Sequence, residues 1–204
     1  MSHGIEPEVV ELLAQRAKAH LRKRARSVRG AVARSALEAR SAAIVARLLE
    51  HPWLEGAKTV ASFWPIEGRS EVDLRAIDPV LRSRGVVVVY PSIDPDTRRM
   101  CFRDPGEPER MEERGLGFAE PEPSLPEAER IDVVLTPCLL VDSTGARLGY
   151  GGGFYDATLP RYCPPGRAIA VAYDFQLQAE VPTSSRDVRV DAIVTDARGL
   201  DASR

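Results

Sequence analysis

Five short apolar runs between residues 59 and 196 constrain the fold of this chain more than any other feature. They lie at 59–64, 86–90, 131–137, 167–173 and 191–196, and each is predicted to be a strand that is apolar on both faces. Such strands form a parallel sheet with helices covering both sides. Residues 74–85 are predicted as a crossover helix, with Pro79 as the weak point, and 154–162 as a short helix. The predicted fold class is α/β with a mostly parallel central sheet.

The amino-terminal part of the chain has two stripes at helical spacing. One stripe is apolar and is expected to face the core; its members are Leu13, Ala17, Leu21, Ala25, Val28 and Val32. The other is basic and lies on the flank of the same helix, where it could grip an anion; its members are Lys18, Arg22, Arg26 and Arg29. Ser35 and Glu38 form a capping-box pattern that predicts the start of a second helix, with Leu37, Ile44 and Leu48 on its buried face and an end at His51.

Composition and charge suggest a single ordinary globular domain whose surface is not strongly basic. A chain of 204 residues with 44% hydrophobic and 28% charged residues suits a single domain, here 1–204, with two helices in 7–51 and an α/β body in 58–204. The proline- and acid-rich segment between 104 and 130 is predicted as a surface connection, because strands resume after it. The net charge of −2 argues against a surface devoted to nucleic acid or anionic membranes.

Other classes of protein are disfavoured by what the chain lacks. Its apolar runs are too short to span a membrane, and acidic residues stand near the start, where a signal peptide needs basic ones; we expect a cytoplasmic protein. The three cysteines and three histidines show neither disulfide nor zinc spacing.

Polar residues follow several of the predicted strands, at the edge where ligands of parallel sheets collect. Among them, the segment Arg147 to Asp156 contains four glycines. Their amides can converge on a phosphate, helped by the amino terminus of the helix that begins near Gly153 and by the guanidinium of Arg147. Asp156 would repel that phosphate unless Mg²⁺ lay between them. The segment fits neither the P-loop nor the dinucleotide fingerprint, and a glycine cluster is also typical of a simple tight turn.

The run RLGYGGGFYD at 147–156, preceded by IDVVLTP at 131–137, resembles the signature of the 5-formyltetrahydrofolate cyclo-ligases, also called methenyltetrahydrofolate synthetases. Four further segments resemble the family in the same order, at 18–22, 63–73, 111–121 and 190–196. The resemblance implies a three-layer α/β sandwich similar to sugar-phosphate isomerases and coenzyme A transferases.

The resemblance also implies an activity, ATP-dependent closure of 5-formyltetrahydrofolate to 5,10-methenyltetrahydrofolate with release of ADP and phosphate. It implies Mg²⁺ held by Asp156 and Asp191, folate contacts from Trp64 and Glu71, and catalytic roles for Arg147 and Asp156. The ATP contacts that it implies are Lys18, Arg22, Arg147, Leu148, Gly149, Tyr150, Gly151, Gly152, Gly153, Phe154 and Tyr155. The folate is the expected partner of a monomer that binds neither nucleic acid nor membrane.

Plainer interpretations stay open beside these. Lys18 and Arg22 could be a solvated flank, Trp64 a core residue, Glu71 a loop or capping residue, and Asp191 the start of a strand. The chain also departs from the family pattern at Cys138, Val141, Gly152 and Arg186, the last in place of a common histidine. The alternative functions are a related enzyme of the same fold that acts on another substrate, including a sugar-phosphate isomerase, and a non-catalytic folate, nucleotide or nucleic-acid binder.

Overall fold

The structure is a computed structural model that describes residues 7–203, and it is built around a seven-stranded sheet ordered β12-β11-β9-β6-β1-β2-β3. The five predicted strands are confirmed with small changes of length, and all five run parallel. They are β1 (Thr59–Ala61), β2 (Val87–Ile93), β6 (Val133–Pro137), β9 (Arg167–Val171) and β11 (Ala192–Val194). Two antiparallel edge strands that the sequence does not predict complete the sheet, β3 (Met100–Arg103) and β12 (Gly199–Asp201).

The strand order fixes where a ligand site can form. β1 pairs with β2 on one side and with β6 on the other, so the chain first builds the sheet outwards in one direction and then returns to extend it in the other. A sheet of this order opens a crevice beyond the carboxyl ends of the two strands at the reversal. The segments that follow β1 and β6 therefore lead into this crevice.

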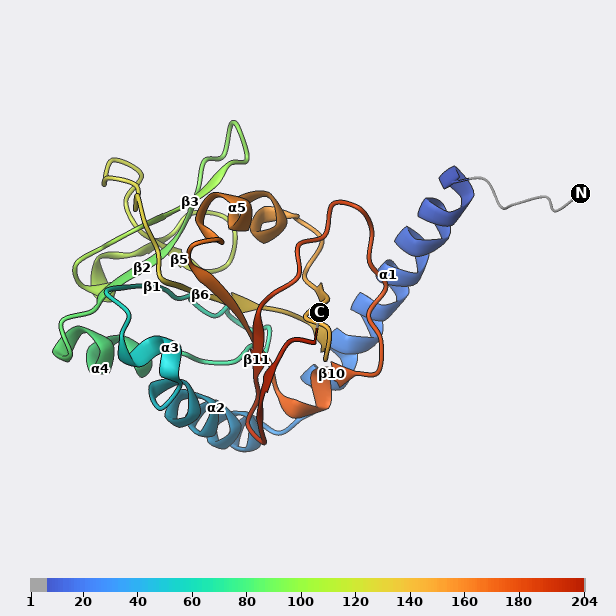
Figure 1. The fold of residues 1–204 in the computed structure, drawn as a ribbon, viewed down its shortest axis with the longest axis horizontal. Helices are drawn as coiled ribbons and strands as arrows, with labels where there is room; N and C mark the ends of the chain where they lie inside the picture. The colour runs from blue at the N-terminus through green and yellow to red at the C-terminus, as the bar shows by residue number, and fades with distance from the viewer. Residues whose placement is uncertain (1–6, 204) are drawn as a thin grey trace, which may run out of the picture.

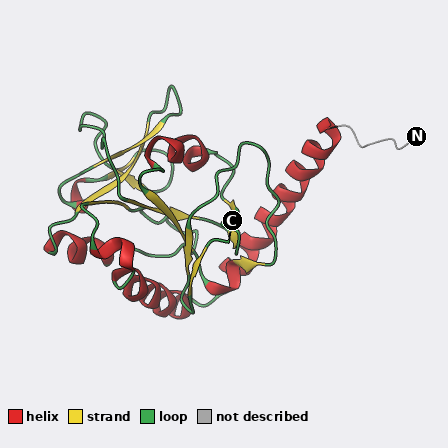
Figure 2. Cartoon of the chain, viewed as in Figure 1, coloured by secondary structure: helices red, strands yellow, loops and turns green. Residues whose placement is uncertain are grey.

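Helices cover both faces of the sheet (Figures 1 and 2). One face carries α2 (Arg34–Leu49), α3 (Pro52–Glu55) and α4 (Ile77–Ser83), and the other carries α5 (Phe154–Tyr162). Each face has its own apolar core; Ile44 and Leu81 belong to the first, and Val134 and Leu159 to the second. α5 has the predicted bounds. The predicted crossover helix forms only as the shorter α4, where Pro79 lies in the first turn and its missing N–H costs no helical hydrogen bond.

Helix α1 (Pro7–Gly30) extends along one side of the molecule, beside the loop that leads to β11 (Figure 1). The predicted orientation of this helix is only partly right. Leu21 and Ala25 of the apolar stripe pack against the body of the protein, but Leu13, Ala17 and Val28 are exposed. Lys18 and Arg29 of the basic stripe are buried instead. Val32 lies beyond the end of the helix. Polar contacts with the body of the protein, described below, hold the basic flank inward.

The predicted start of α2 is also wrong. The helix begins at Arg34 after Ala33, and no side chain caps it, so Ser35 already lies inside the first turn. Glu38 accepts a hydrogen bond from Arg34 at 2.9 Å instead of completing a capping box. The predicted buried face of Leu37, Ile44 and Leu48 is confirmed.

Smaller elements complete the fold. A three-stranded sheet is formed by β10 (Leu177–Gln178), β7 (Leu140–Asp142) and β8 (Arg147–Leu148), and its apolar residues pack against Ala25 of α1. The segment between 104 and 130 contains the short helix η1 (Pro108–Arg110) and the hairpin of β4 (Glu112–Glu113) and β5 (Ala119–Glu120); a further short helix, η2 (Asp174–Gln176), follows β9.

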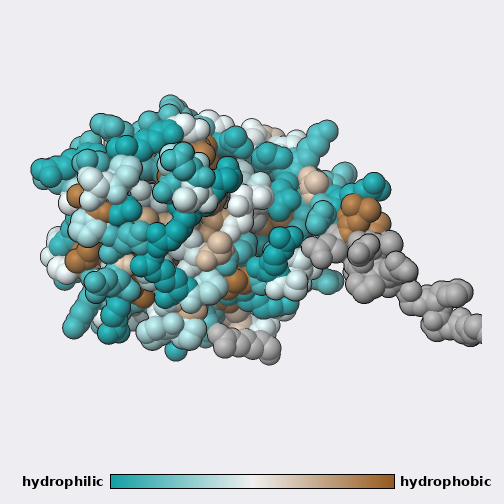
Figure 3. Space-filling model, turned by 90° about the horizontal axis from the view of Figure 1, so that it is seen from above, coloured by the Kyte–Doolittle hydropathy of each residue, from teal (hydrophilic) through white to brown (hydrophobic). Residues whose placement is uncertain are grey.

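The surface has no extended apolar area on the face seen in Figure 3, where hydrophilic side chains predominate and hydrophobic ones are scattered. The large apolar side chains exposed in the described part of the chain include Leu12 and Leu13 on α1 and Leu116 beside β5. Among the helices of residues 7–203, none combines the length and apolar character that crossing a membrane requires.

Candidate active site

The glycine segment connects the end of β8 to the start of α5, and its backbone explains the glycines. Gly151 and Gly153 have φ angles of +106° and +70°, which glycine adopts at little cost. A Cβ on Gly152 would lie 2.7 Å from the ring of Phe154, so a larger residue there requires this ring to move. Two positions therefore favour glycine for the turn, and a third allows the Phe154 ring to approach the backbone closely.

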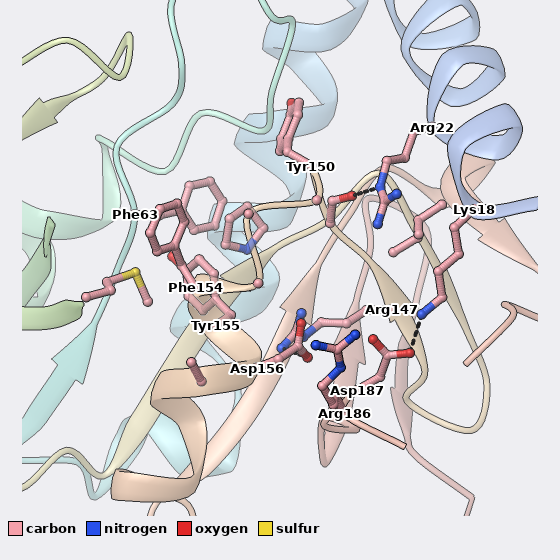
Figure 4. A pocket seen from close by; sticks show the side chains of 18 of the residues that line it. Lys18, Arg22, Phe63, Arg147, Tyr150, Phe154, Tyr155, Asp156, Arg186 and Asp187 are labelled. Carbon is pink, nitrogen blue, oxygen red and sulfur yellow. Dashed lines mark hydrogen bonds and ion pairs between the residues drawn. The ribbon is translucent and has the colours of Figure 1, made fainter. Parts of the chain in front are cut away.

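This segment forms the floor of a cavity of about 940 Å³. Every residue that the family resemblance assigns to ATP, folate or catalysis lines it, whereas Asp191, assigned to Mg²⁺ alone, does not. The predicted residues along the wall are Lys18, Arg22, Trp64, Glu71, Arg147, Leu148, Gly149, Tyr150, Gly151, Gly152, Gly153, Phe154, Tyr155 and Asp156. Figure 4 shows charged side chains from α1, β8 and the loop before β11 at one end, and the rings of Phe63, Phe154 and Tyr155 at the other.

At the charged end, two basic residues tie α1 to the rest of the site. The ammonium of Lys18, a 9% exposed residue, forms an ion pair with Asp187 and lies 3.5 Å from Oγ of Ser184. Arg22 donates from Nε to the carbonyl oxygen of Gly149 at 2.9 Å. The basic stripe is therefore part of the cavity wall, and the interpretation of Lys18 and Arg22 as a solvated flank is wrong.

The ion pair of Lys18 changes the titration of its partner. Burial favours the protonated form of Asp187, but hydrogen bonds from Lys18 and Ser184 outweigh that effect and hold the pKa of the carboxyl below its ordinary value. Asp187 therefore stays ionised at neutral pH and fixes the ammonium of Lys18 at the cavity wall.

Arg147 and Asp156 form a second ion pair within the same end. The side chain of Arg147 is 3% exposed, and its terminal nitrogen lies 3.0 Å from Oδ1 of Asp156; the same oxygen accepts a hydrogen bond from the amide of Val188 at 3.0 Å. The Nε of Arg147 is buried without a hydrogen-bond partner among the described residues. Asp156 thus holds the guanidinium in place, and Arg147 offsets the negative charge that Asp156 would present to a phosphate.

The aromatic end combines apolar walls with one buried carboxylate. Trp64 packs edge-on against Tyr90, with ring centroids 5.9 Å apart, while it also lines the cavity, so it is both a packing residue and a wall. Glu71 is 8% exposed and accepts a hydrogen bond from the amide of Ile66 at 2.6 Å. This bond holds the Glu71 carboxylate at the cavity wall.

The hydroxyls of the two tyrosines of the glycine segment have different surroundings. Tyr150 is held between Arg29 and Arg69, whose guanidinium carbons lie 5.5 and 5.6 Å from its ring centroid, and its hydroxyl also accepts a hydrogen bond from Arg29. The hydroxyl of Tyr155 has no partner among the described residues. Burial raises the pKa of both tyrosines, so both hydroxyls keep their protons at neutral pH.

Asp191 lies away from this cavity. It precedes β11, at the amino ends of the parallel strands, and its Oδ2 accepts a hydrogen bond from the amide of Ala168 at 2.9 Å. The structure therefore does not bring Asp191 together with Asp156, and its geometry supports the interpretation as the start of a strand. Residues 7–203 also contain no group of three or more His, Cys, Asp or Glu side chains arranged to hold a metal ion.

Several lining residues escape the sequence analysis. Ser184 and Asp187 lie in a loop without periodicity, and Arg186, noted only as a departure from the family, lines the cavity beside them. An inward-facing basic stripe needs acidic partners, which is the one signal that could have pointed to Asp187. Cys138 is buried, and burial raises the pKa of its thiol to about 12, so it packs as a small apolar residue.

Comparison with known proteins identifies the family. Residues 14–196 match the family described as the 5-formyltetrahydrofolate cyclo-ligase family. The chain belongs to this family of ligases. Among curated relatives, it is similar to the 5-formyltetrahydrofolate cyclo-ligase of Escherichia coli K12, with 29% identity over 74% of this chain and 85% of the relative. The cyclo-ligase of Mycolicibacterium smegmatis is 44% identical over 44% of this chain, and the match spans 47% of that relative's length.

Solved structures agree with this membership of the cyclo-ligase family. The 5,10-methenyltetrahydrofolate synthetase of Aquifex aeolicus superposes with a TM-score of 0.79 at 25% identity, over 92% of this chain and 93% of that one. The synthetase of Mycoplasma pneumoniae superposes with a TM-score of 0.70 at 26% identity, over 88% of this chain and 98% of that one. The predicted α/β class with its mostly parallel sheet is confirmed.

Proposed function

We propose that the protein catalyses ATP-dependent cyclisation of 5-formyltetrahydrofolate to 5,10-methenyltetrahydrofolate, with release of ADP and phosphate. One observation carries this proposal. A single cavity has a cationic end floored by glycine amides and an aromatic end with a buried carboxylate. Two substrates of different chemistry, a polyphosphate and a flat heterocycle, can meet in such a cavity, and the residues of both ends match the signature of a ligase family.

The proposed reaction proceeds in two steps, with ATP as a substrate. The formyl oxygen on N5 attacks the γ-phosphorus of ATP, and ADP leaves. N10 then attacks the activated formyl carbon, loses its proton, and the C–O bond breaks to release phosphate. Phosphoryl transfer of this kind depends mainly on positioning and charge neutralisation.

The cationic end supplies the groups that this transfer needs. Arg147 has a buried Nε without a partner among the described residues, so its guanidinium still has hydrogen-bonding capacity for a phosphate oxygen. Lys18 and Arg22 add positive charge from α1, and the amides of Gly151 to Gly153 lead into the amino terminus of α5. We assign to these residues the binding of the ATP phosphates.

A magnesium ion fits this site only when the phosphates are present. Mg²⁺ is commonly held by one or two carboxylates together with substrate phosphates, and Asp156 offers one carboxylate at the cavity wall. Both hydrogen bonds described above reach its Oδ1. We therefore assign Asp156 as the protein ligand and give Asp191 no metal role. When bound, the ion would neutralise charge on the transferring phosphate.

The aromatic end suits the folate. The rings of Phe63 and Trp64 offer apolar surface to the pterin, and the fixed carboxylate of Glu71 can accept its N–H donors. A monomeric state is part of the proposal, and size-exclusion chromatography with light scattering tests it. A cytoplasmic location stays part of the proposal, with cell fractionation as its test.

The direct test is one incubation of the protein with (6S)-5-formyltetrahydrofolate, ATP and Mg²⁺, followed by the near-ultraviolet absorbance of the methenyl product. We expect absorbance only when ATP is present, with ADP formed in equal amount. Product without ATP would refute the ligase mechanism. Binding of folate without turnover would favour the non-catalytic alternative, and ATP hydrolysis without methenyl product would favour an enzyme with another substrate.

A further inference from the structure

A second cavity, of about 240 Å³, lies behind the glycine segment and shares a wall with the first. Met100, Gly152, Gly153, Phe154 and Ala157 line both cavities. β3, which starts at Met100, packs against α5 here, and Thr158 donates a hydrogen bond to the carbonyl of Met100 at 3.2 Å. The partition between the two cavities thus consists of part of the glycine segment and of the side chains of Met100, Phe154 and Ala157. These side chains lie toward the apolar end of the first cavity, the end that we assign to folate.

The second cavity is strongly basic. Among the described residues, its remaining polar lining consists of Arg98, Arg99, Arg161 and Thr158, and no carboxylate lines it. Glu127, outside the lining, accepts hydrogen bonds from Arg99 at 2.7 and 2.8 Å and from Arg161 at 2.6 Å. This carboxylate pairs with two of the three lining guanidinium groups, so the lining keeps a net positive charge.

Among the three arginines that line this cavity, Arg98 is the one that pairs with no carboxylate of the described residues. Its guanidinium lies 5.2 Å from the ring centroid of Phe154 and forms no ion pair or side-chain hydrogen bond with the described residues. Arg98 also has a φ angle of +55°, in the left-handed region where glycine, asparagine or aspartate is usual. A long basic residue thus stands at a turn position whose backbone favours short side chains, and it lies over the aromatic partition.

We propose that this basic cavity binds the carboxylates of the glutamate tail of the folate substrate. The inference rests on the proposed function, since it takes the folate ring to lie at the aromatic end of the large cavity. In a folate, an aminobenzoyl group separates the ring from glutamate, which matches the order of surfaces here: aromatic wall, apolar partition of Met100 and Phe154, then arginines. Arg98 is the specificity-determining residue of this site, and Arg99 and Arg161 add to its positive potential.

The test compares substrates that differ only in their tail. Cyclisation rates are measured for 5-formyltetrahydropteroate, which has no glutamate, and for the forms with one and three glutamates, using the parent protein and Arg98→Asn. Asparagine suits the left-handed backbone at this position, so the variant should fold. Arg110→Gln, a change at an exposed arginine outside both cavities, is the matched control.

In the parent and in Arg110→Gln, we expect KM to fall about two- to fivefold when the tail is added, the range for a partly solvated charge pair, and the effect to shrink at high salt. In Arg98→Asn the tail should change KM little, while kcat on the tail-less substrate and KM for ATP stay at the parent values. An equal tail effect in Arg98→Asn and the parent would overturn the inference, as would a parent protein that is indifferent to the tail. Failure of the parent to cyclise any of the three substrates would instead refute the proposed function.

Discussion

Replacement of Asp156 by asparagine separates two roles that the structure gives this residue. Asparagine keeps the size of the side chain and an oxygen that can accept from Arg147 and from the amide of Val188. It removes the negative charge that would bind a metal. If Asp156 only positions Arg147, most of the arrangement should survive the substitution; if Asp156 holds Mg²⁺, the metal requirement should change.

The effect on stability follows from the two hydrogen bonds. The bond with Arg147 loses one of its two charges, which lowers a contribution of about 1.5–3 kcal/mol towards the value of about 0.5–1.5 kcal/mol for neutral groups. The Asp156 side chain is 24% exposed, so water screens part of the difference, and we expect a loss of about 1–2 kcal/mol. For a chain of this length, Tm should fall by about 2–8 °C, which leaves a folded and assayable enzyme.

The assay is the cyclisation rate at increasing Mg²⁺ concentration. We expect the rate of Asp156→Asn to be at least about tenfold lower at limiting Mg²⁺, equal to about 1.4 kcal/mol of transition-state stabilisation, and to recover partly as Mg²⁺ is raised. Asp132→Asn is the control, because Asp132 accepts hydrogen bonds from the amides of Lys58 and Thr59 outside the cavity; its magnesium curve should match that of the parent. Normalised curves that superimpose for Asp156→Asn and the parent would refute the metal role.

Three further predictions follow from the contacts of single residues. Lys18→Ala should raise KM for ATP about 10- to 100-fold through loss of a charge-assisted hydrogen bond and leave KM for folate unchanged; unaltered ATP kinetics would contradict the phosphate role. Gly151→Ala should lower stability by about 1–2 kcal/mol, because its φ of +106° is unfavourable for alanine, and denaturant unfolding checks this. Hydrogen bonds from Arg99 and Arg161 lower the pKa of Glu127 to about 2, so this carboxylate stabilises the fold fully above its unfolded pKa of about 4.3. Unfolding free energies should therefore differ between the parent and Glu127→Gln at neutral pH, and the difference should shrink as the pH falls from about 4.3 towards 2; a difference independent of pH would contradict this assignment.

The strands were predictable because their residues are apolar on both faces, a pattern that few structures other than a covered parallel sheet explain. The edge strands were not, since β3 and β12 span four and three residues and lie beside charged positions. Periodicity also failed in part for α1. Its apolar and basic stripes have the same spacing, so the pattern cannot tell which one faces inward; the partners of Lys18 and Arg29, distant in sequence, decide it.

For the site, the glycine segment and its neighbours were predictable from a local motif, whereas the loop that contains Ser184 and Asp187 contacts the site only through the tertiary fold. Asp191 could have been questioned from the sequence itself. The rule used for the site residues of the α/β body selects positions that follow a strand, because ligands collect at the carboxyl ends of parallel strands. Asp191 precedes its strand, and the structure accordingly places it at the opposite edge.

The central claim is that one cavity holds the ATP phosphates at its cationic end and the folate ring at its aromatic end. A crystal structure of the protein with a non-hydrolysable ATP analogue, Mg²⁺ and 5-formyltetrahydrofolate tests it most directly. We predict the γ-phosphate against Arg147 and the glycine amides, the metal between that phosphate and Asp156, and the pterin beside Trp64 and Glu71, with the formyl oxygen facing the γ-phosphorus. A nucleotide bound elsewhere on the protein, or phosphates that do not contact the glycine segment, would contradict this account.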